Sequence, residues 1–168
     1  MTFKIYLMNN EEFYDRFKKC DSSDEFYEIF KQARQHWEKH VEDFDKAILL
    51  NRNLPYCLRF IVTDEDGNIL GYIGARVLPH TLYAFDVFVD KRYRNQGVAT
   101  FLYNNLKDIL KREYKAPDDR IGLRIYTDNA EAVKLMAKLG FVEGDSGLAM
   151  ATAPNEIQLM LTREMLCK

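Results

Sequence analysis

Three apolar, strand-like segments follow one another between residues 56 and 89, with only short turns between them. They read YCLRFIVT, ILGYIGARVL and LYAFDVFV. The first turn, DEDGN, has a glycine where a positive φ is needed, and the second contains Pro79 and His80. Two strands joined by so short a connection pair in antiparallel fashion. We therefore predict an antiparallel meander, which commits the middle of the chain to a sheet.

The region before the meander is helical in pattern. Residues 11–53 carry apolar side chains at three- and four-residue steps, the spacing of one helix face; these are Phe26, Ile29, Phe30, Ala33 and Trp37. Asn9 and Asn10 are suitable N-cap residues after an opening strand, FKIYLM. We predict two helices here, with a break between His36 and Asp43.

The region after the meander alternates between the two periodicities. We predict a helix over 98–114, a strand over 121–127, a helix over 129–139, a short strand over 140–143 and a last strand over 156–165. The resulting order, β, α, α, β, β, β, α, β, α, β, β, is an α+β plan with a mixed sheet. No repeat or Pro/Gly-rich linker interrupts it, so we expect a single domain over residues 1–168.

Composition excludes several classes of protein. The 168 residues include 24 Lys and Arg against 26 Asp and Glu, a formal net charge of −2, whereas nucleic-acid binding requires clustered surplus cations. The three cysteines form no CxxC pair, so neither a metal site nor a disulfide framework is expected. The opening residues turn polar too early for a secretory signal, and no apolar run approaches the ~20 residues that span a bilayer. We expect a cytoplasmic protein that binds neither nucleic acid nor membrane.

One segment of the chain has the features of a ligand-binding loop. A strand ends at Val89, a basic turn follows, and Gly97 stands where the next helix begins. The first amides of a helix have no internal acceptors, and a glycine allows a ligand to approach the backbone. The amides of residues 95–100 therefore form a candidate cradle for a diphosphate. No GK[ST] occurs, as a P-loop would need, and a dinucleotide fingerprint would need more glycines than this segment holds.

The sequence RNQGVA, residues 94–99, resembles the (R/Q)-x-x-G-x-(G/A) signature of the GNAT superfamily of N-acetyltransferases. The preceding residues are similar to the family's V-x-P-x-Y-R-x-x-G pattern, with Lys91 in place of the proline; the residues in register are Val89, Tyr93, Arg94 and Gly97. TDNAEAVKLMAKLGFVE resembles the second family block, N-x-x-A-x-x-x-Y-x-x-x-G-F, through Asn129, Ala132, Gly140 and Phe141. The resemblance covers residues 60–163.

The resemblance implies a fold and a cofactor. The fold would be a mixed, mostly antiparallel sheet with splayed central strands, flanked by helices. Acetyl-CoA would be the co-substrate, held in the gap between those strands, and an amine acceptor would attack the thioester directly while a backbone amide near Val89 polarised its carbonyl. The cofactor-binding residues implied are Val87, Phe88, Val89, Arg94, Asn95, Gln96, Gly97, Val98, Ala99, Thr100 and Asn129.

Two positions depart from the family's proton-transfer groups. The usual tyrosine acid is Met136, and the strand position where some members carry a glutamate base is Arg124. We therefore take Asp86 and Tyr126 as the catalytic candidates: Asp86 could accept a proton directly or through water, and Tyr126, like Tyr83, could supply one. His36, Trp37 and His40 fall where the family builds acceptor pockets.

The acceptor is left open between a small amine and a protein amine. A different class of function also remains: a non-catalytic acyl-CoA-binding or regulatory module on the same scaffold, which Met136 and Arg124 favour. A weaker alternative is a nucleotide-binding protein that uses the loop for a mononucleotide. A homodimer is compatible with the apolar last strands but is not required by any feature.

Overall fold

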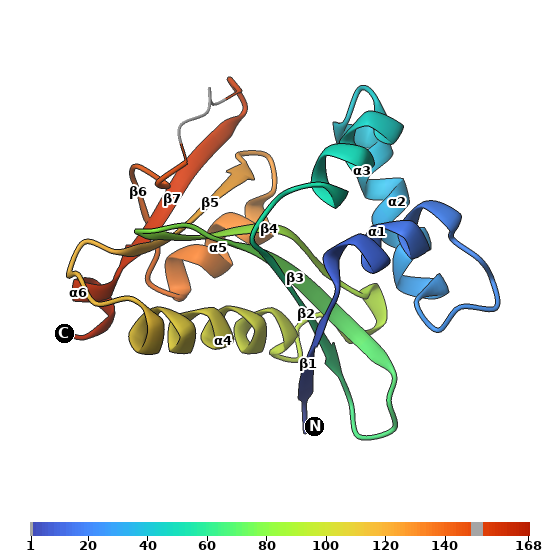
Figure 1. Cartoon of the computed structure of the whole chain (residues 1–168), viewed down its shortest axis with the longest axis horizontal. Helices are drawn as coiled ribbons and strands as arrows, with labels where there is room; N and C mark the ends of the chain where they lie inside the picture. Colours follow the sequence, from blue (N-terminus) through green and yellow to red (C-terminus); the bar gives the residue numbers. More distant parts are fainter. Residues whose placement is uncertain (1, 149–152) are drawn as a thin grey trace. The chain divides into compact units, whose positions relative to one another are not determined.

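The structure is a computed structural model that describes residues 2–148 and 153–168 (Figure 1). The chain forms two compact units. Unit 1 contains the residues up to Gly74 together with Asp86–Leu102, and unit 2 contains Ala75–Phe85 and the residues from Tyr103 onward. The organisation as one domain stays a prediction. Two strands and one helix each contribute residues to both units.

Unit 1 contains β1 (Lys4–Met8), β2 (Cys57–Thr63) and the larger part of the meander's second strand, up to Gly74. β1 and β2 pair antiparallel, with Lys4 opposite Thr63 and Met8 opposite Arg59. β2, β3 (Ile69–Val77) and β4 (Thr81–Val89) are neighbours in that order, as the meander requires. Gly67, in the turn before β3, has φ 87°, which confirms the predicted role of this glycine.

The helical region of unit 1 forms three helices, where the sequence predicted two. They are α1 (Asn10–Lys19), α2 (Tyr27–His40) and α3 (Phe44–Arg52). Asn9 caps α1 and Asp43 caps α3 through their side chains, so the predicted cap and the second break are correct. The missed break begins at Cys20, which ends α1 in the left-handed conformation with φ 45°. Asp24 fixes the following turn, because its carboxylate accepts hydrogen bonds from Arg16.

Aromatic side chains fill the core of unit 1. The aromatic members come from α1, from α2 and the residue before it, and from β3 and β4, while α3 and β2 each add an isoleucine; the buried cluster is Phe13, Tyr14, Phe17, Phe26, Ile29, Phe30, Ala33, Ile48, Ile61, Ile69, Tyr72 and Phe88. The rings pack edge-to-face and stacked, as in the pair Phe13 and Tyr72, whose centroids are 4.8 Å apart. The predicted helix face of α2 is therefore its buried face.

Unit 2 contains the other half of the sheet, in the order β4, β5 (Arg120–Tyr126), β7 (Glu156–Thr162), β6 (Val142–Glu143). β4 and β5 are parallel, whereas β7 is antiparallel to both β5 and β6. Within the described residues, three residue pairs join β4 to β5, at Thr81–Tyr83 and Arg120–Gly122, against seven between β5 and β7. Such short pairing suits the splayed central strands that the resemblance implies.

The helices of unit 2 follow the predicted positions with one correction. α4 (Val98–Glu113) begins in unit 1 and continues here, and α5 (Ala130–Lys138) follows β5. The last strand was predicted to reach residue 165, but it ends at Thr162, and α6 (Arg163–Leu166) follows. The hydroxyl of Thr162 accepts the amide of Met165, so this residue caps a helical turn.

The predicted α+β class with a mixed, mostly antiparallel sheet is confirmed by this topology. None of the helices in the described part of the chain combines the length and apolar character needed to cross a membrane.

Candidate cofactor site

The loop between β4 and α4 begins at Asp90, a buried carboxylate. Asp90 caps a single 3-10 turn, Lys91–Tyr93, by accepting the amide of Arg92 at 2.9 Å. The guanidinium of Arg92 returns to the same carboxylate, with Nη2 2.8 Å from Oδ2. Arg92 is therefore bound to Asp90 through both its main chain and its side chain. These bonds fix the direction in which the chain leaves the sheet.

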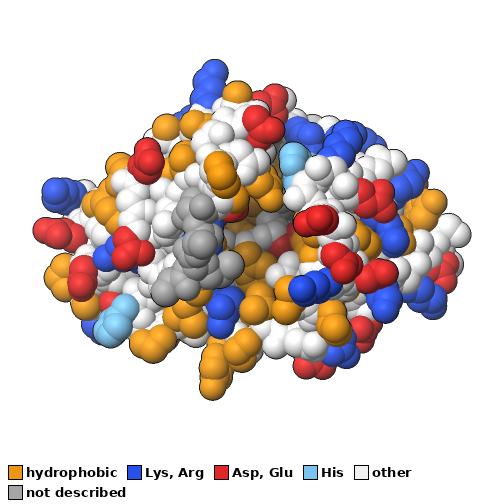
Figure 2. Space-filling view, turned by 90° about the horizontal axis from the view of Figure 1, so that it is seen from above, with side chains coloured by type: hydrophobic (Ala, Val, Ile, Leu, Met, Phe, Trp, Pro, Cys, Tyr) orange, Lys and Arg blue, Asp and Glu red, His pale blue; other side chains and the backbone are white. Residues whose placement is uncertain are grey.

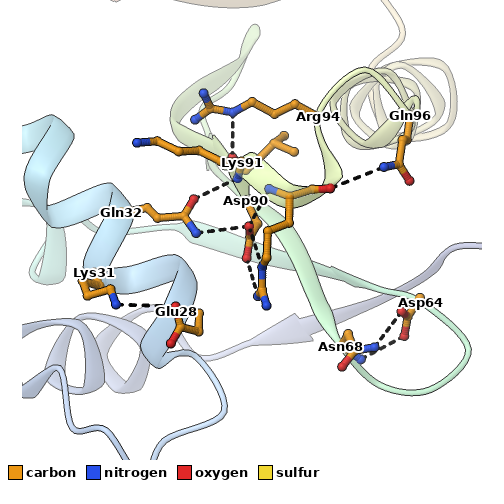
Figure 3. A network of polar contacts seen from close by, with 11 residues as sticks. Glu28, Lys31, Gln32, Asp64, Asn68, Asp90, Lys91, Arg94 and Gln96 are labelled. Carbon is orange, nitrogen blue, oxygen red and sulfur yellow. Dashed lines mark hydrogen bonds and ion pairs between the residues drawn. The ribbon is translucent and has the colours of Figure 1, made fainter.

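A residue of α2 braces the same turn (Figure 3). The side-chain amide of Gln32 donates to Oδ1 of Asp90 at 3.1 Å, and its oxygen accepts the amide of Lys91 at 2.8 Å. Sequence reasoning missed Gln32, because a glutamine on a helix carries no signal for a contact so distant in sequence. The helical region and the loop are thus joined by two hydrogen bonds.

Two left-handed residues shape the loop itself. Asn95 has φ 62° and Gly97 has φ 88°. Alternation of such conformations turns successive amides toward one point, a geometry that binds anions. The carbonyl of Gly97 accepts the amide of Phe101, so the first amides of α4, from Val98 to Thr100, point outward from the helix end. A Cβ on Gly97 would have only the Phe3 ring near it, at 3.9 Å, so the space in front of the loop is open within unit 1.

Arg94 lies at the edge of this loop. Its Nε donates to the carbonyl of Val89 at 3.1 Å (Figure 3). Its guanidinium carbon lies 5.3 Å from the centre of the Phe88 ring. Among the described residues the guanidinium forms no ion pair. Its position is therefore held by the end of β4, while its charge is not neutralised by a neighbouring carboxylate.

Gly71 on β3 permits the close packing beneath the loop. A Cβ at this position would lie 2.9 Å from the carbonyl oxygen of Phe88 and 3.0 Å from a methyl of Val98. The end of β4 and the first turn of α4 therefore approach β3 more closely than any other residue would allow. The glycine was assigned to a strand by the sequence, but its role depends on two segments that only the fold brings together.

Asp86 interrupts β4 with φ 48°, a left-handed conformation that is rare for a residue with a side chain. Its carboxylate is only 5% exposed. Oδ2 accepts a hydrogen bond of 2.5 Å from the hydroxyl of Tyr14 and lies 3.2 Å from Nη2 of Arg59. The predicted proton acceptor is thus a buried, hydrogen-bonded group.

The environment of Asp86 acts on its pKa in opposite directions. Burial raises the pKa of the carboxyl above its ordinary value of 3.8, and the charge of Arg59 with the hydrogen bond from Tyr14 only partly offsets that effect. Burial likewise raises the pKa of Tyr14 well above that of a free phenol. The cluster can therefore hold a proton more firmly than an exposed carboxylate would.

The predicted acceptor-pocket residues His36, Trp37 and His40 lie on α2 in unit 1. The rings of His36 and His40 are 4.7 Å apart, and His36 lies 6.1 Å from the ring of Phe88. Trp37 packs 5.6 Å from Phe17, at the edge of the aromatic core. Trp37 therefore packs against the aromatic core of unit 1.

The remaining candidates lie in unit 2. Tyr126, at the end of β5, is half-buried, and burial raises the pKa of its phenol, followed by the charges of Glu156 and Asp128. Asn129 is exposed and caps α5, with its side-chain oxygen accepting the amide of Ala132 at 3.2 Å. The cofactor candidates from Val87 to Thr100 thus lie together in unit 1, and Asn129 lies with Tyr126 in unit 2.

The two positions that depart from the family pattern have structural contacts of their own. Met136 is 3% exposed and belongs to the core of unit 2. Arg124 donates from Nη2 to the carbonyl of Leu148 at 3.2 Å, and so fastens the segment after β6 to β5. These contacts give Met136 a packing role and Arg124 a hydrogen bond to the main chain.

The surface charges are mixed in sign. On the face shown in Figure 2, Lys and Arg side chains are interspersed with Asp and Glu and with hydrophobic residues. Among the residues coloured there, no broad area carries a single sign of charge, so this face offers no long-range steering toward a highly charged partner.

The strand, left-handed loop and helix start define the class of protein. Residues 10–141 match the model of the acetyltransferase (GNAT) family, so the chain belongs to this family. An L-amino acid N-acetyltransferase of Escherichia coli is 32% identical over 92 residues, with 52% of this chain and 56% of that protein covered. An N-alpha-acetyltransferase of Saccharolobus solfataricus is 28% identical over 128 residues, with 60% of this chain and 75% of that protein covered. The chain thus spans little more than half the length of the E. coli relative.

Solved structures agree on the fold. An acetyltransferase of the GNAT family from Staphylococcus aureus superposes with a TM-score of 0.70 at 18% identity, covering 96% of this chain and 99% of that chain. A ribosomal-protein-S18-alanine N-acetyltransferase from E. coli gives 0.62 at 20% identity, covering 98% and 96%. A streptothricin acetyltransferase from Bacillus anthracis, solved with acetyl coenzyme A, gives 0.52 at 28% identity, covering 66% and 64%.

Proposed function

We propose that the protein is an N-acetyltransferase that transfers an acetyl group from acetyl-CoA to an amine by direct attack in a ternary complex. The observation that carries the proposal is the loop from Arg94 to Thr100. It combines two left-handed residues, open space at Gly97 and the unpaired amides of a helix start. These donors match the geometry and charge of a diphosphate, and family membership supports the same assignment.

The cofactor, when bound, supplies the acetyl thioester. The loop amides and Arg94 hold its diphosphate, while the backbone of Val87 to Val89 orients the pantetheine arm along β4. Asn129, exposed at the start of α5, is the cofactor contact proposed for unit 2. Most of the rate would come from holding the amine and the thioester together and from an amide donor at the thioester carbonyl.

Proton transfer is assigned to Asp86 and Tyr126. Asp86 would accept a proton from the amine, with its basicity increased by burial. Tyr126 would supply a proton to the departing thiolate, and its raised pKa keeps the phenol protonated at neutral pH. Both roles are proposals about this chain's own residues, since Met136 and Arg124 occupy the family positions.

Two kinds of amine are candidates for the acceptor. The similar proteins include an L-amino acid N-acetyltransferase, and the similar structures include a ribosomal-protein-S18-alanine N-acetyltransferase, whose names give a small amine and a protein amine as acceptors. We propose a primary amine of either kind, bound near His36 and His40, and a cytoplasmic location in keeping with the cysteine usage.

The proposal is tested first by calorimetric titration with acetyl-CoA and, separately, with CoA. Saturable binding in the micromolar range supports the cofactor site, and a thiol-release assay over a panel of amino acids, polyamines and peptides then identifies the acceptor. No binding to either ligand would refute the assignment.

A non-catalytic acyl-CoA-binding module is the second candidate, and the buried Met136 and the tethered Arg124 favour it. It predicts tight binding of acetyl-CoA without thiol release on any amine. Acetylation of one amine above the rate without enzyme would exclude it.

A further inference from the structure

Arg59 is a charged side chain enclosed in the core of unit 1. It lies on β2 and has no exposed surface. Its guanidinium carbon is 3.9 Å from the centre of the Phe13 ring and 5.4 Å from that of Tyr72, so aromatic faces cover it. Removing an arginine from water is costly, and such a group is retained where it holds specific partners. The partners of Arg59 include Asp86 on β4 and Tyr14 on α1.

The guanidinium grips one residue at two places. Nη1 donates to the main-chain carbonyl of Asp86 at 3.2 Å, while Nη2 lies 3.2 Å from Oδ2 of the same residue. Nη2 also donates to the hydroxyl of Tyr14 at 2.7 Å, and that hydroxyl donates in turn to Asp86. Both the side chain and the backbone of Asp86 are therefore anchored to β2 and α1.

This grip falls where β4 is strained. The φ of 48° at Asp86 is unfavourable for a residue with a Cβ, and such a conformation persists only where the surroundings fix it. None of the peptide bonds in the described part of the chain is cis. In a trans peptide the carbonyl and the following N–H point to opposite sides. Because Arg59 holds the carbonyl of Asp86 on the core side, the N–H of Val87 is turned away from Arg59.

We propose that Arg59 is a positioning residue that fixes the peptide between Asp86 and Val87, so that the Val87 N–H is presented to the thioester carbonyl of acetyl-CoA. The inference rests on the proposed function, in which the backbone of Val87 to Val89 orients the pantetheine arm and an amide donor meets the thioester carbonyl. Arg59 acts from the buried side of β4, without touching the ligand.

The test uses Arg59→Lys, which keeps the charge but cannot span the carbonyl and the carboxylate with one fork. Two measurements are made on the full chain labelled with 15N-valine: dissociation constants for acetyl-CoA and CoA, and the Val87 amide resonance. In the wild type we expect acetyl-CoA to shift this resonance downfield relative to CoA. In Arg59→Lys we expect less than half that shift and about fivefold weaker acetyl-CoA binding, with CoA binding changed less than twofold.

Two further variants separate positioning from stability. Tyr14→Phe keeps the ring but removes the hydroxyl that joins Arg59 to Asp86, so we expect a change in the same direction; it also replaces Arg59→Lys if that variant does not fold. Ile61→Ala, on the same strand and equally buried, is the control. It should lower the melting temperature and leave both dissociation constants and the Val87 resonance unchanged.

The outcomes are distinguishable. A wild-type protein that binds neither ligand refutes the proposed function and this inference together. A wild type that binds both, with no acyl-dependent shift at Val87, overturns only the inference. The inference is also overturned if Arg59→Lys and Tyr14→Phe keep the wild-type shift and affinities, or if Ile61→Ala loses them equally.

Discussion

The side-chain amide of Gln32, on α2, donates a 3.1 Å hydrogen bond to Oδ1 of Asp90, the carboxylate that caps the turn before the loop. The same side chain accepts the amide of Lys91 at 2.8 Å. The region of the chain that carries no family motif is thereby attached to the region that carries the strongest one. A helix expected to contact the acceptor thus also determines where the cofactor loop begins.

We predict that Gln32→Leu weakens acetyl-CoA binding by about three- to tenfold, because two hydrogen bonds that hold the start of the loop are lost. Calorimetric titration measures the effect. Gln35→Leu, an identical change at an exposed position of the same helix, is the control and should bind normally. Equal affinities for the two variants would mean that α2 does not support the loop.

We predict that Gly97→Glu abolishes binding of acetyl-CoA and CoA, since a carboxylate would enter the open space in front of the loop amides and repel the diphosphate. Gly67→Glu is a matched control, because Gly67 also has a positive φ but lies in the turn between β2 and β3. Both variants should lose stability for the same backbone reason, and only the first should lose the ligand. Wild-type affinity in Gly97→Glu would refute the cradle.

We predict that Asp86→Asn lowers turnover at least about tenfold while CoA affinity stays within about twofold, as removal of a general base does. Burial raises the pKa of Asp86, so the acid limb of the wild-type pH–rate profile should lie above 3.8. The base acts when deprotonated, so the rate rises with pH through this limb. In the variant the limb should disappear. An unchanged profile would exclude Asp86 as the base.

We predict that the ion pair of Arg16 with Asp24 stabilises unit 1 by about 1 kcal/mol at neutral pH, since the pair is bidentate and Asp24 is 16% exposed. The hydrogen bond from Arg16 holds the pKa of Asp24 below its ordinary 3.8. A lowered pKa means that this stability is present above the unfolded-state value and is lost as the pH falls through the folded-state value.

Urea unfolding at pH 7 and at decreasing pH measures this contribution. Asp24→Asn should be less stable than the wild type at pH 7, and the difference should shrink as the pH falls below 3.8. Ser22→Ala, a change of a non-titrating residue at an exposed position of the same turn, is the control, and its difference from the wild type should not vary with pH. A difference that stayed constant with pH would assign the effect of Asp24→Asn to the turn rather than to the charge.

The sequence predicted most elements because their periodicities are local. The meander, the helix from Val98 and the helix after Asn129 lie where apolar spacing placed them. The break after Lys19 was missed because the aromatic spacing of α2 masked a polar stretch, CDSSDE, whose turn depends on the pairing of Asp24 with Arg16. The end of β7 was missed because Thr162 is both a good strand residue and a good cap.

The residues of the candidate site also differ in whether the sequence alone could identify them. The loop was identifiable from the motif around Gly97, whose positive φ the structure confirms. The buried contacts of Asp86 were not identifiable, since Arg59 stands in a strand whose pattern does not reveal an inward-facing cation. Contacts between residues far apart in sequence, such as Gln32 with Lys91, leave no periodic trace.

The close packing at Gly71 has a consequence for mutational screens. A methyl group there would meet the Phe88 carbonyl at 2.9 Å and displace either the end of β4 or the first turn of α4. A selection for variants that have lost acetyl-CoA binding should therefore recover position 71 together with position 97. A geneticist reading such a map would place position 71 among the ligand contacts, although its contribution is the volume that it leaves empty.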